Sequence, residues 1–251
     1  MLRIATWNVE RPKLSEATRR ARLLEAMQTM QADIWVLTET HTALSPGSGF
    51  TAVTSQGTDR PCEPGETWVT IWSRFPMQPV DHTSDSCRAI AVRITLPGAK
   101  ALIVYGTVLP WLGSTWQGIP AAGGAAFSAA LTAQLADWRS LQQDNPDCDF
   151  ILAGDLNQDL SSSHYYGSKK NRIALQSALL TANLQCLTAA ELDPVPKHAP
   201  SHASIDHICI SQGLTLVRST VSWPMSNRPQ KNLSDHFGVL VELGSNASLA
   251  V

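Results

Sequence analysis

The segment 150-FILAGDLNQDL-160 joins a run of apolar residues directly to a carboxylate and a carboxamide. Its first four residues have the composition of a buried β-strand. Asp155 and Asn157 follow that strand two positions apart. Both residue types are favoured in turns, so either one alone needs no chemical explanation. The segment therefore raises the question whether the pair belongs to a larger set of functional side chains.

The composition of the whole chain is that of a globular domain of enzyme size. Of its 251 residues, 43% are hydrophobic and 16% are charged, and eight are tryptophans. Such a chain can bury a substantial core, and nothing in it resembles a linker, so we expect a single domain over residues 1–251. The net charge of −2 disfavours a protein that holds long nucleic acid through a basic face.

The N-terminal segment and the cysteines bear on location. The sequence MLRIATWNVE enters a strand-like run without the regions of a signal peptide, and no stretch approaches 18 apolar residues. The five cysteines are scattered and form no Cys-x-x-Cys pair, so we interpret them as buried or incidental thiols. We expect a cytoplasmic protein with no membrane span, and no protein partner is predicted.

Short apolar runs alternate with segments of helical periodicity, which predicts mixed α and β structure. Strands are expected at 2–6, 34–37, 67–73, 89–96, 101–108, 150–154, 205–210, 214–223 and 237–243. The period-two runs between residues 67 and 104 indicate antiparallel sheet. Each half of the chain reads as strand, helix and strand, which suggests two similar layers.

Three helices are expected between these strands. The first follows Ser15, the candidate N-cap, and its apolar stripe consists of Ala17, Ala21, Leu24 and Met27. The second follows a Gly- and Ala-rich loop around 118–126, and its inner face consists of Phe127, Leu131, Trp138 and Leu141. The third lies near 172–183.

Polar side chains recur at the ends of the expected strands. They are Asn8, Glu39, Asp155 with Asn157, Asp206, and Asp235 with His236. Open sheets place ligand sites just outside strand ends, so these side chains can share one site. Oxygen-rich ligands without cysteine favour a hard divalent cation such as Mg²⁺ or Mn²⁺. A cation held in this way suits the chemistry of phosphate esters.

Five segments carry a resemblance to a known family. TWNVE, LTET, GDLNQ, SIDHI and SDHFGV, in this order, resemble the signature blocks of the endonuclease/exonuclease/phosphatase superfamily. They span residues 6–239. The resemblance implies an α/β (α+β) fold, a four-layer α/β sandwich with two packed mixed β-sheets flanked by helices. It also implies a metal-dependent hydrolase that cleaves a phosphodiester or phosphomonoester by in-line attack of an activated water.

The resemblance further implies which side chains hold the cation. Carried over position by position, it makes Glu39 the principal ligand of Mg²⁺ or Mn²⁺. Asn8 lies beside Glu39, and Asp235 lies near or on the metal. The substrate is a phosphoester, with nucleic acid slightly preferred among the candidates.

The same resemblance implies the roles of the remaining side chains. Asp155 would orient and deprotonate the attacking water, and Asn157 would position that water or the phosphate. His236, paired with Asp206, would contact a non-bridging phosphate oxygen. Asp206 is expected to hold the imidazole in one tautomer and to favour the charged imidazolium, which is a stronger donor.

Three positions depart from the family pattern. Many relatives place a His or Tyr that assists the leaving group or the phosphate where this chain has Thr107. Tyr105 lies two residues earlier on the same face of the strand, so both are candidate site residues. Glu66 can be compared with an acidic residue of some nucleases, although a surface role is favoured. Ser204 replaces the Arg that many relatives carry before Ile-Asp.

Several alternatives remain open at this point. The chain could be a non-catalytic binding module on the same fold, or a phosphatase of lipids or inositol phosphates, because a fold does not select its substrate. His198 and His202 are four residues apart, but Pro196 and Pro200 disfavour the helix that a zinc site would need. The loop SHYYGSKKNR, 163–172, could stack on a base or could be an ordinary surface loop.

Overall fold

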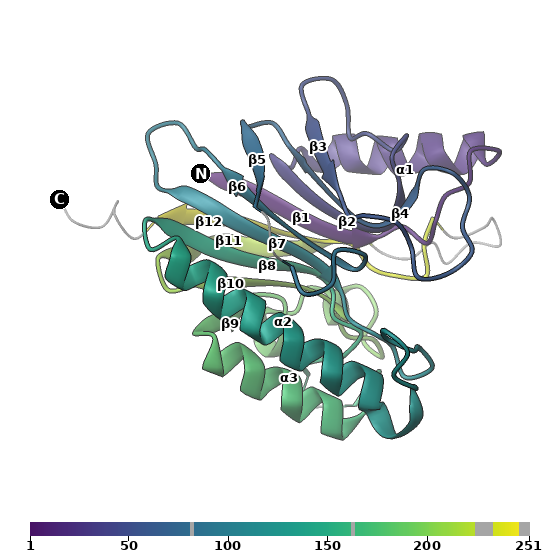
Figure 1. Ribbon diagram of the computed structural model, residues 1–251. Coiled ribbons are helices and arrows are strands. Elements are labelled where there is room, and N and C mark those ends of the chain that lie inside the picture. The colour runs from purple at the N-terminus through teal and green to yellow at the C-terminus, as the bar shows by residue number, and fades with distance from the viewer. Residues whose placement is uncertain (81–82, 162–163, 224–232, 246–251) are drawn as a thin grey trace.

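The computed structural model describes residues 1–80, 83–161, 164–223 and 233–245. Within these residues two six-stranded β-sheets pack face to face, and helices cover both outer faces (Figure 1). Helix α1 (Ala17–Met30) lies on the first sheet, and α2 (Ala125–Asp144) and α3 (Lys169–Thr181) lie side by side on the second. The predicted four-layer sandwich is therefore confirmed.

Each sheet is mixed, with strands drawn from distant parts of the chain. In spatial order, the first sheet consists of β11 (Leu214–Ser222), β12 (Val239–Ser245), β1 (Leu2–Asn8), β2 (Ile34–His41), β4 (Glu66–Ser73) and β3 (Thr51–Thr54). The second consists of β5 (Met77–Val80), β6 (Ala89–Ile94), β7 (Ala101–Val108), β8 (Cys148–Asp155), β10 (Asp206–Ser211) and β9 (Leu184–Cys186). Short 3₁₀ helices occupy Ala122–Gly124, Ala190–Leu192 and Val195–Lys197.

The two sheets are built on the same plan. Strands β1 and β2 are parallel and are joined through α1, and strands β7 and β8 are parallel and are joined through α2. The other paired strands in the described residues run antiparallel. This arrangement agrees with the expected strand–helix–strand pattern in each half. Because parallel strands end at the same edge of a sheet, the plan brings Asn8 and Glu39 to one edge.

Branched apolar side chains fill the space between the sheets. Val36, Val69, Val104 and Ile151 are fully buried there. At Gly106 an added Cβ would lie 2.8 Å from the Cγ1 of Val69, so the close approach of the two sheets requires glycine. The core therefore fixes how the two sheets lie relative to one another.

The inner face of α2 is as predicted, but that of α1 is not. Phe127, Leu131, Trp138 and Leu141 of α2 are all buried against the second sheet. In α1 the buried residues are Leu23 and Met27, whereas Ala17 and Ala21 are exposed and Leu24 is only half-buried. The N-cap is Glu16 rather than Ser15, and its side chain makes no capping hydrogen bond. Leu23, Met27 and the partly buried Ala26 pack against the tryptophan-rich face of the sheet, so the rotation of the helix decides which residues are buried.

Three short edge strands, β3, β5 and β9, were not expected. Residues of β3 and β5 are exposed or half-buried, so they show no apolar alternation to indicate a strand.

None of the helices in the described part of the chain combines the length and the hydropathy needed to cross a membrane.

Candidate active site

Side chains from both sheets meet where β1, β8 and β10 end or begin. Asp206 lies opposite Asp155 in the register of β10 and β8. The backbone N–H of Asn8 donates to Oδ1 of Asp206 at 3.1 Å, and Nδ2 of Asn8 donates to Oδ2 of Asp155 at 3.0 Å. Asn8 therefore joins the first sheet to the two carboxylates of the second.

Asp155 and Asn157 form a compact local unit. The backbone N–H of Asn157 donates to Oδ1 of Asp155 at 2.9 Å, and its Nδ2 donates to Oδ2 of the same carboxylate at 3.1 Å. Nδ2 of Asn157 also donates to the carbonyl of Leu109 at 2.9 Å. Asn157 has a φ of +51°, which asparagine tolerates better than most residues. The geometry holds the Asp155 carboxylate in one orientation.

The pKa of Asp155 suits a base that works near neutral pH. Burial raises this pKa from its ordinary value to about 7, and the charges of Asp206 and Glu39 add to the effect. The positive charge of His236 and the hydrogen bond from Asn8 act in the opposite direction. A carboxyl group with this pKa can take up a proton from water at neutral pH.

His236 forms an ion pair with Asp206. Its Nδ1 donates to Oδ2 of Asp206 at 2.6 Å. Its backbone is held as well, since its N–H donates to Oγ of Ser234 at 3.0 Å and its carbonyl accepts from Nε1 of Trp7 at 3.1 Å. Burial lowers the pKa of His236, but the charges of Asp206 and Asp155 outweigh burial and raise the pKa to about 10. The imidazolium is therefore the form present at neutral pH.

The first prediction concerns this pKa. In the variant Asp206→Asn the pKa of His236 should fall from about 10 toward the ordinary value of about 6.5, because the nearest negative charge is lost. A raised pKa contributes stability below the unfolded pKa, and this contribution is lost as pH rises through about 10. Titration of the His236 ring carbon and proton signals by NMR measures both values.

Asp235→Asn is the matched control for that titration. Oδ1 of Asp235 lies 3.8 Å from Nε2 of His236, but the Asp235 side chain is 67% exposed, so water screens its charge. Its removal should shift the pKa of His236 much less. An unchanged pKa in Asp206→Asn would show that the ion pair does not hold the proton on the ring.

Glu39 stands at the carboxyl end of β2 in an unusual backbone conformation. Its φ is +45°, and the ladder between β2 and β4 pairs Thr38 and Thr40 but not Glu39. Its carboxylate forms an ion pair with the guanidinium of Arg11. Burial raises the pKa of Glu39 to about 7, with further contributions from the charges of Asp235 and Asp206. A strained, buried acid of this kind is typical of a functional position.

The carboxylates of the site fit a hard divalent cation. Glu39 and Asp155 are both buried, and burial is the largest cause that raises both pKa values to about 7, so a bound cation would favour their ionised forms. Among the described residues, the group of possible metal ligands within 4.8 Å of one another is Asp155, Asp206 and His236. Nδ1 of His236 is bonded to Asp206, which leaves oxygen atoms as the main donors. Oxygen donors are those that Mg²⁺ and Mn²⁺ prefer.

Thr107 and Tyr105 lie away from this cluster. Both face α2, as their two-residue spacing on β7 predicts. Oγ1 of Thr107 donates to Gln134 at 2.9 Å and to the carbonyl of Arg88 at 3.2 Å, and the hydroxyl of Tyr105 donates to Asp137 at 2.9 Å. Strand β7 turns this face toward the helix layer, so neither side chain is brought to the carboxylates.

The other departures from the family pattern are structural in this molecule. Glu66 forms an ion pair with Arg60 at 3.7 Å, and its carboxylate is nearly buried. Ser204 is bonded through its N–H and its hydroxyl to the buried Asp193, at 2.8 and 2.6 Å. His207, the neighbour of Asp206 on β10, bonds to Thr188 and to the carbonyl of Gln158 rather than to the cluster. It is buried, with Nε2 2.9 Å from the carbonyl of Gln158.

Arg11 and Ser234 are site residues that the sequence interpretation missed. Arg11 pairs with Glu39 from the loop after β1. Oγ of Ser234 donates to the carbonyl of Asn8 at 2.6 Å and accepts from His236, so it links two blocks of the site. Arg11 directly follows the block TWNVE and Ser234 is the first residue of the block SDHFGV, which is the only signal that pointed to them. His198 and His202 belong to no cluster of three or more metal ligands in the described part of the chain.

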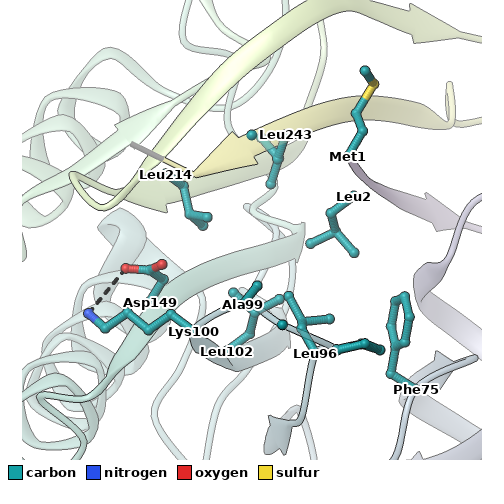
Figure 2. Close-up of a pocket in the computed structure, with 13 residues that line it drawn as sticks. Met1, Leu2, Phe75, Leu96, Ala99, Lys100, Leu102, Asp149, Leu214 and Leu243 are labelled. Atoms are coloured by element: carbon teal, nitrogen blue, oxygen red, sulfur yellow. Dashed lines mark hydrogen bonds and ion pairs between the residues drawn. The ribbon is translucent and has the colours of Figure 1, made fainter. Parts of the chain in front are cut away.

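A cavity of about 450 Å³ lies at the other end of the sheets (Figure 2). Leu2, Leu214 and Leu243 point into it, and Lys100 pairs with Asp149 at its edge, 3.4 Å apart. These residues belong to the start of β1, β8 and β11 and to the end of β12, whereas the site lies at the opposite strand ends. The cavity is therefore separate from the candidate active site.

Comparisons with known proteins agree with this fold. A family model described as "Endonuclease/Exonuclease/phosphatase family" matches residues 5–236. No curated protein matches the sequence. The endonuclease/exonuclease/phosphatase from Bacteroides vulgatus is 15% identical, with a TM-score of 0.68 over 97% of this chain and 98% of that chain.

Two other solved structures are similar in the same way. The human Nocturnin catalytic domain, with a bound sulfate anion, is 16% identical, with a TM-score of 0.65 over 97% of this chain and 93% of that chain. D. rerio TDP2, complexed with a single-strand DNA product, is also 16% identical, with a TM-score of 0.63 over 97% and 99% of the respective chains. At such identities the likeness shows the fold alone.

Proposed function

Because this chain belongs to the endonuclease/exonuclease/phosphatase family, we propose that it is a divalent-metal-dependent phosphoesterase with a preference for nucleotide-type substrates. The observation that carries the proposal is the convergence of Asn8, Asp155, Asp206 and His236 from both sheets. Asp155 would supply a base, His236 a charged donor and Asn8 an amide oxygen for a cation, to which Glu39 and Asp235 would add carboxylate oxygens. Hydrolysis of a phosphoester by in-line attack of water needs all three.

Glu39, Asn8 and Asp235 would hold the cation. When bound, Mg²⁺ or Mn²⁺ supplies positive charge to the phosphate and lowers the pKa of water. The Asn8 amide lies close to two carboxylates, because its side chain is hydrogen-bonded to Asp155 and to Glu39. Asp235 is largely exposed beside His236, where it can approach a ligand from the solvent side.

Asp155 is the proposed general base. Its carboxylate is fixed by Asn8 and Asn157, and its pKa of about 7 leaves a substantial fraction ionised at neutral pH. It would accept a proton from the attacking water, while the amide of Asn157 would position the water or the phosphate. General base assistance of this kind commonly contributes about 10² to 10⁴ in rate.

His236 is the proposed donor to a non-bridging phosphate oxygen. Its Nδ1 is occupied by Asp206, so Nε2 is the nitrogen left to face the substrate. The imidazolium is fully charged at neutral pH because its pKa is about 10. A charged donor stabilises the negative charge that spreads over the phosphate oxygens in the transition state.

The test of the proposed function is metal-dependent hydrolysis of bis-p-nitrophenyl phosphate. Protein treated with EDTA should be inactive, and Mg²⁺ or Mn²⁺ should restore turnover. Glu39→Gln should raise the Mg²⁺ concentration needed for half-maximal activity by about 10-fold or more. Calorimetric titration with Mg²⁺ checks the same loss of affinity without turnover.

Glu66→Gln is the control for the metal titration. Glu66 is likewise a nearly buried glutamate paired with an arginine, and it lies on the neighbouring strand outside the cluster. Its Mg²⁺ requirement should equal that of the unmodified protein. Absence of Mg²⁺ and Mn²⁺ binding together with absence of turnover would reject the proposed function and favour a non-catalytic binding module.

A further inference from the structure

Four aromatic rings lie in a row beside the catalytic histidine. The rings of Tyr166 and Tyr165 are 6.5 Å apart, those of Tyr165 and His202 are 5.0 Å apart, and those of His202 and Phe237 are 5.8 Å apart. Phe237 follows His236 in the chain and is buried in the core between the sheets. One end of the row is therefore the residue that follows His236 in the chain.

The middle of this row is open to solvent. Tyr165 is 37% exposed, whereas Phe237 at one end is 8% exposed and Tyr166 at the other end is half-buried. Tyr165 and His202 also line a hollow of about 620 Å³, together with the polar side chains of His164, Glu191 and Ser201. An aromatic ring that is supported on one side and open on the other can stack on a planar ligand.

A buried carboxylate holds the tyrosines in place. Asp159 has a fully buried side chain, and it accepts the backbone N–H of Tyr165 at 3.0 Å and that of Tyr166 at 2.8 Å. Arg172 of α3 donates to the same carboxylate at 3.1 Å. The ordering of this segment therefore precedes binding, which lowers the entropic cost of stacking.

The tyrosines lie within electrostatic reach of the catalytic carboxylates. Burial raises the pKa of Tyr165, and the charge of Asp235 raises it further. For Tyr166 burial is again the largest cause, followed by the charges of Asp155 and Asp235. Asp159, which holds both tyrosines, follows Asp155 by four residues, so the tyrosines lie on the loop that leaves the proposed active site.

We propose that Tyr165 and His202 form a stacking subsite for the nucleobase that adjoins the scissile phosphate. This inference rests on the proposed phosphoesterase function. In a nucleotide only the sugar separates the base from the phosphate, so a ring surface beside the phosphate site matches that geometry. Inositol phosphates and phospholipid headgroups have no aromatic face to stack. The row of rings therefore selects nucleotides within the range of phosphoesters.

The charge of the protein limits the length of this substrate. A net charge of −2 disfavours the extended basic face that a long polyanion needs. A short nucleotide or the end of a strand needs only the local contacts of the site. Stacking then supplies the affinity that phosphate contacts alone would not.

The experiment compares three dinucleotides with Mg²⁺ present. They are thymidylyl-thymidine and its two analogues in which one thymine, on the 5′ or the 3′ side, is absent from the sugar. In the unmodified protein, loss of the base on one side should lower kcat/KM by about 5-fold to 100-fold. Tyr165→Leu should lower kcat/KM for thymidylyl-thymidine by a similar factor and leave that for the matching abasic analogue within about 2-fold.

Two further variants separate stacking from a structural role. Tyr165→Phe keeps the ring and should behave as the unmodified protein. His202→Ala removes the neighbouring ring, which belongs to a different segment, and should give the same base-dependent loss. This variant tests the subsite if Tyr165→Leu proves unstable. Equal losses on all three dinucleotides, or no loss on any, would overturn the subsite.

Failure of the subsite can be distinguished from failure of the proposed function. Metal-dependent hydrolysis of bis-p-nitrophenyl phosphate without cleavage of any dinucleotide would reject the subsite and leave the phosphoesterase in place. Absence of hydrolysis of every substrate would reject the proposed function itself. Calorimetric titration with thymidine 5′-phosphate and with 2-deoxyribose 5-phosphate adds a readout without turnover, and only the former should lose affinity in Tyr165→Leu.

Discussion

Asp155→Asn should lower kcat by about 10²- to 10⁴-fold, because the amide cannot accept a proton from the attacking water. The carboxylate accepts hydrogen bonds from Asn8 and from both donors of Asn157. An amide in its place would turn one NH₂ group toward these donors, so some loss of thermal stability is expected as well. Steady-state kinetics with bis-p-nitrophenyl phosphate at saturating Mg²⁺ gives kcat, and thermal unfolding shows the folded fraction.

Asp149→Asn is the matched control for Asp155→Asn. Asp149 is also a buried carboxylate at the end of β8, and it pairs with Lys100 at the opposite end of the strand from Asp155. Its replacement should reduce thermal stability while kcat stays within about 2-fold. A folded Asp155→Asn protein with nearly unchanged kcat would remove Asp155 from the role of general base.

His236→Gln should lower kcat by about 10²- to 10³-fold, the range for removal of one transition-state donor. Glutamine can still donate a hydrogen bond, but it carries no charge. The imidazolium of His236 is charged at neutral pH because Asp206 helps to raise its pKa to about 10. The unmodified protein should therefore lose rate as pH rises through about 10 and His236 loses its proton. Rates measured from neutral pH upward should show this loss in the unmodified protein and not in the variant.

His198→Gln is the control for the histidine substitution. His198 is exposed in the loop after the 3₁₀ helix Val195–Lys197, and it belongs to no ligand cluster among the described residues. Its kcat and pH profile should match those of the unmodified protein. If His236→Gln keeps the full rate and the same pH profile, the charged donor is not part of the reaction.

The sequence determined the elements and the residues at their ends. Apolar runs and helical periodicity located the main strands and the three α-helices of the described residues, and the four predicted inner-face residues of α2 are all buried, together with Ala126, Ala130 and Gln134. Such patterns report which face of an element is buried, because burial depends on side chains that are close in the chain. The pairing of β1 with β2 through α1 follows from the same local order.

The edge strands β3 and β5 and the buried face of α1 could not be predicted from the local sequence pattern. Strands β3 and β5 carry exposed or half-buried residues, so their hydrogen bonds to β4 and β6 are fixed by neighbouring strands rather than by their own composition. In α1, the choice of Leu23 over Ala21 depends on the tryptophan-rich sheet surface opposite it. Both cases concern contacts with parts of the chain that are distant in sequence.

The site divides in the same way. The sequence placed Asn8, Asp155, Asp206 and His236 at strand ends, but their contacts join residues 147 positions apart for Asn8 and Asp155 and 198 positions apart for Asn8 and Asp206. Only the register of β8 with β10 and the packing of the two sheets decide which atoms meet. The same packing turned Tyr105 toward α2 and away from the carboxylates. Residue type and spacing determine which chemistry a side chain can perform, and tertiary packing determines which other groups it contacts.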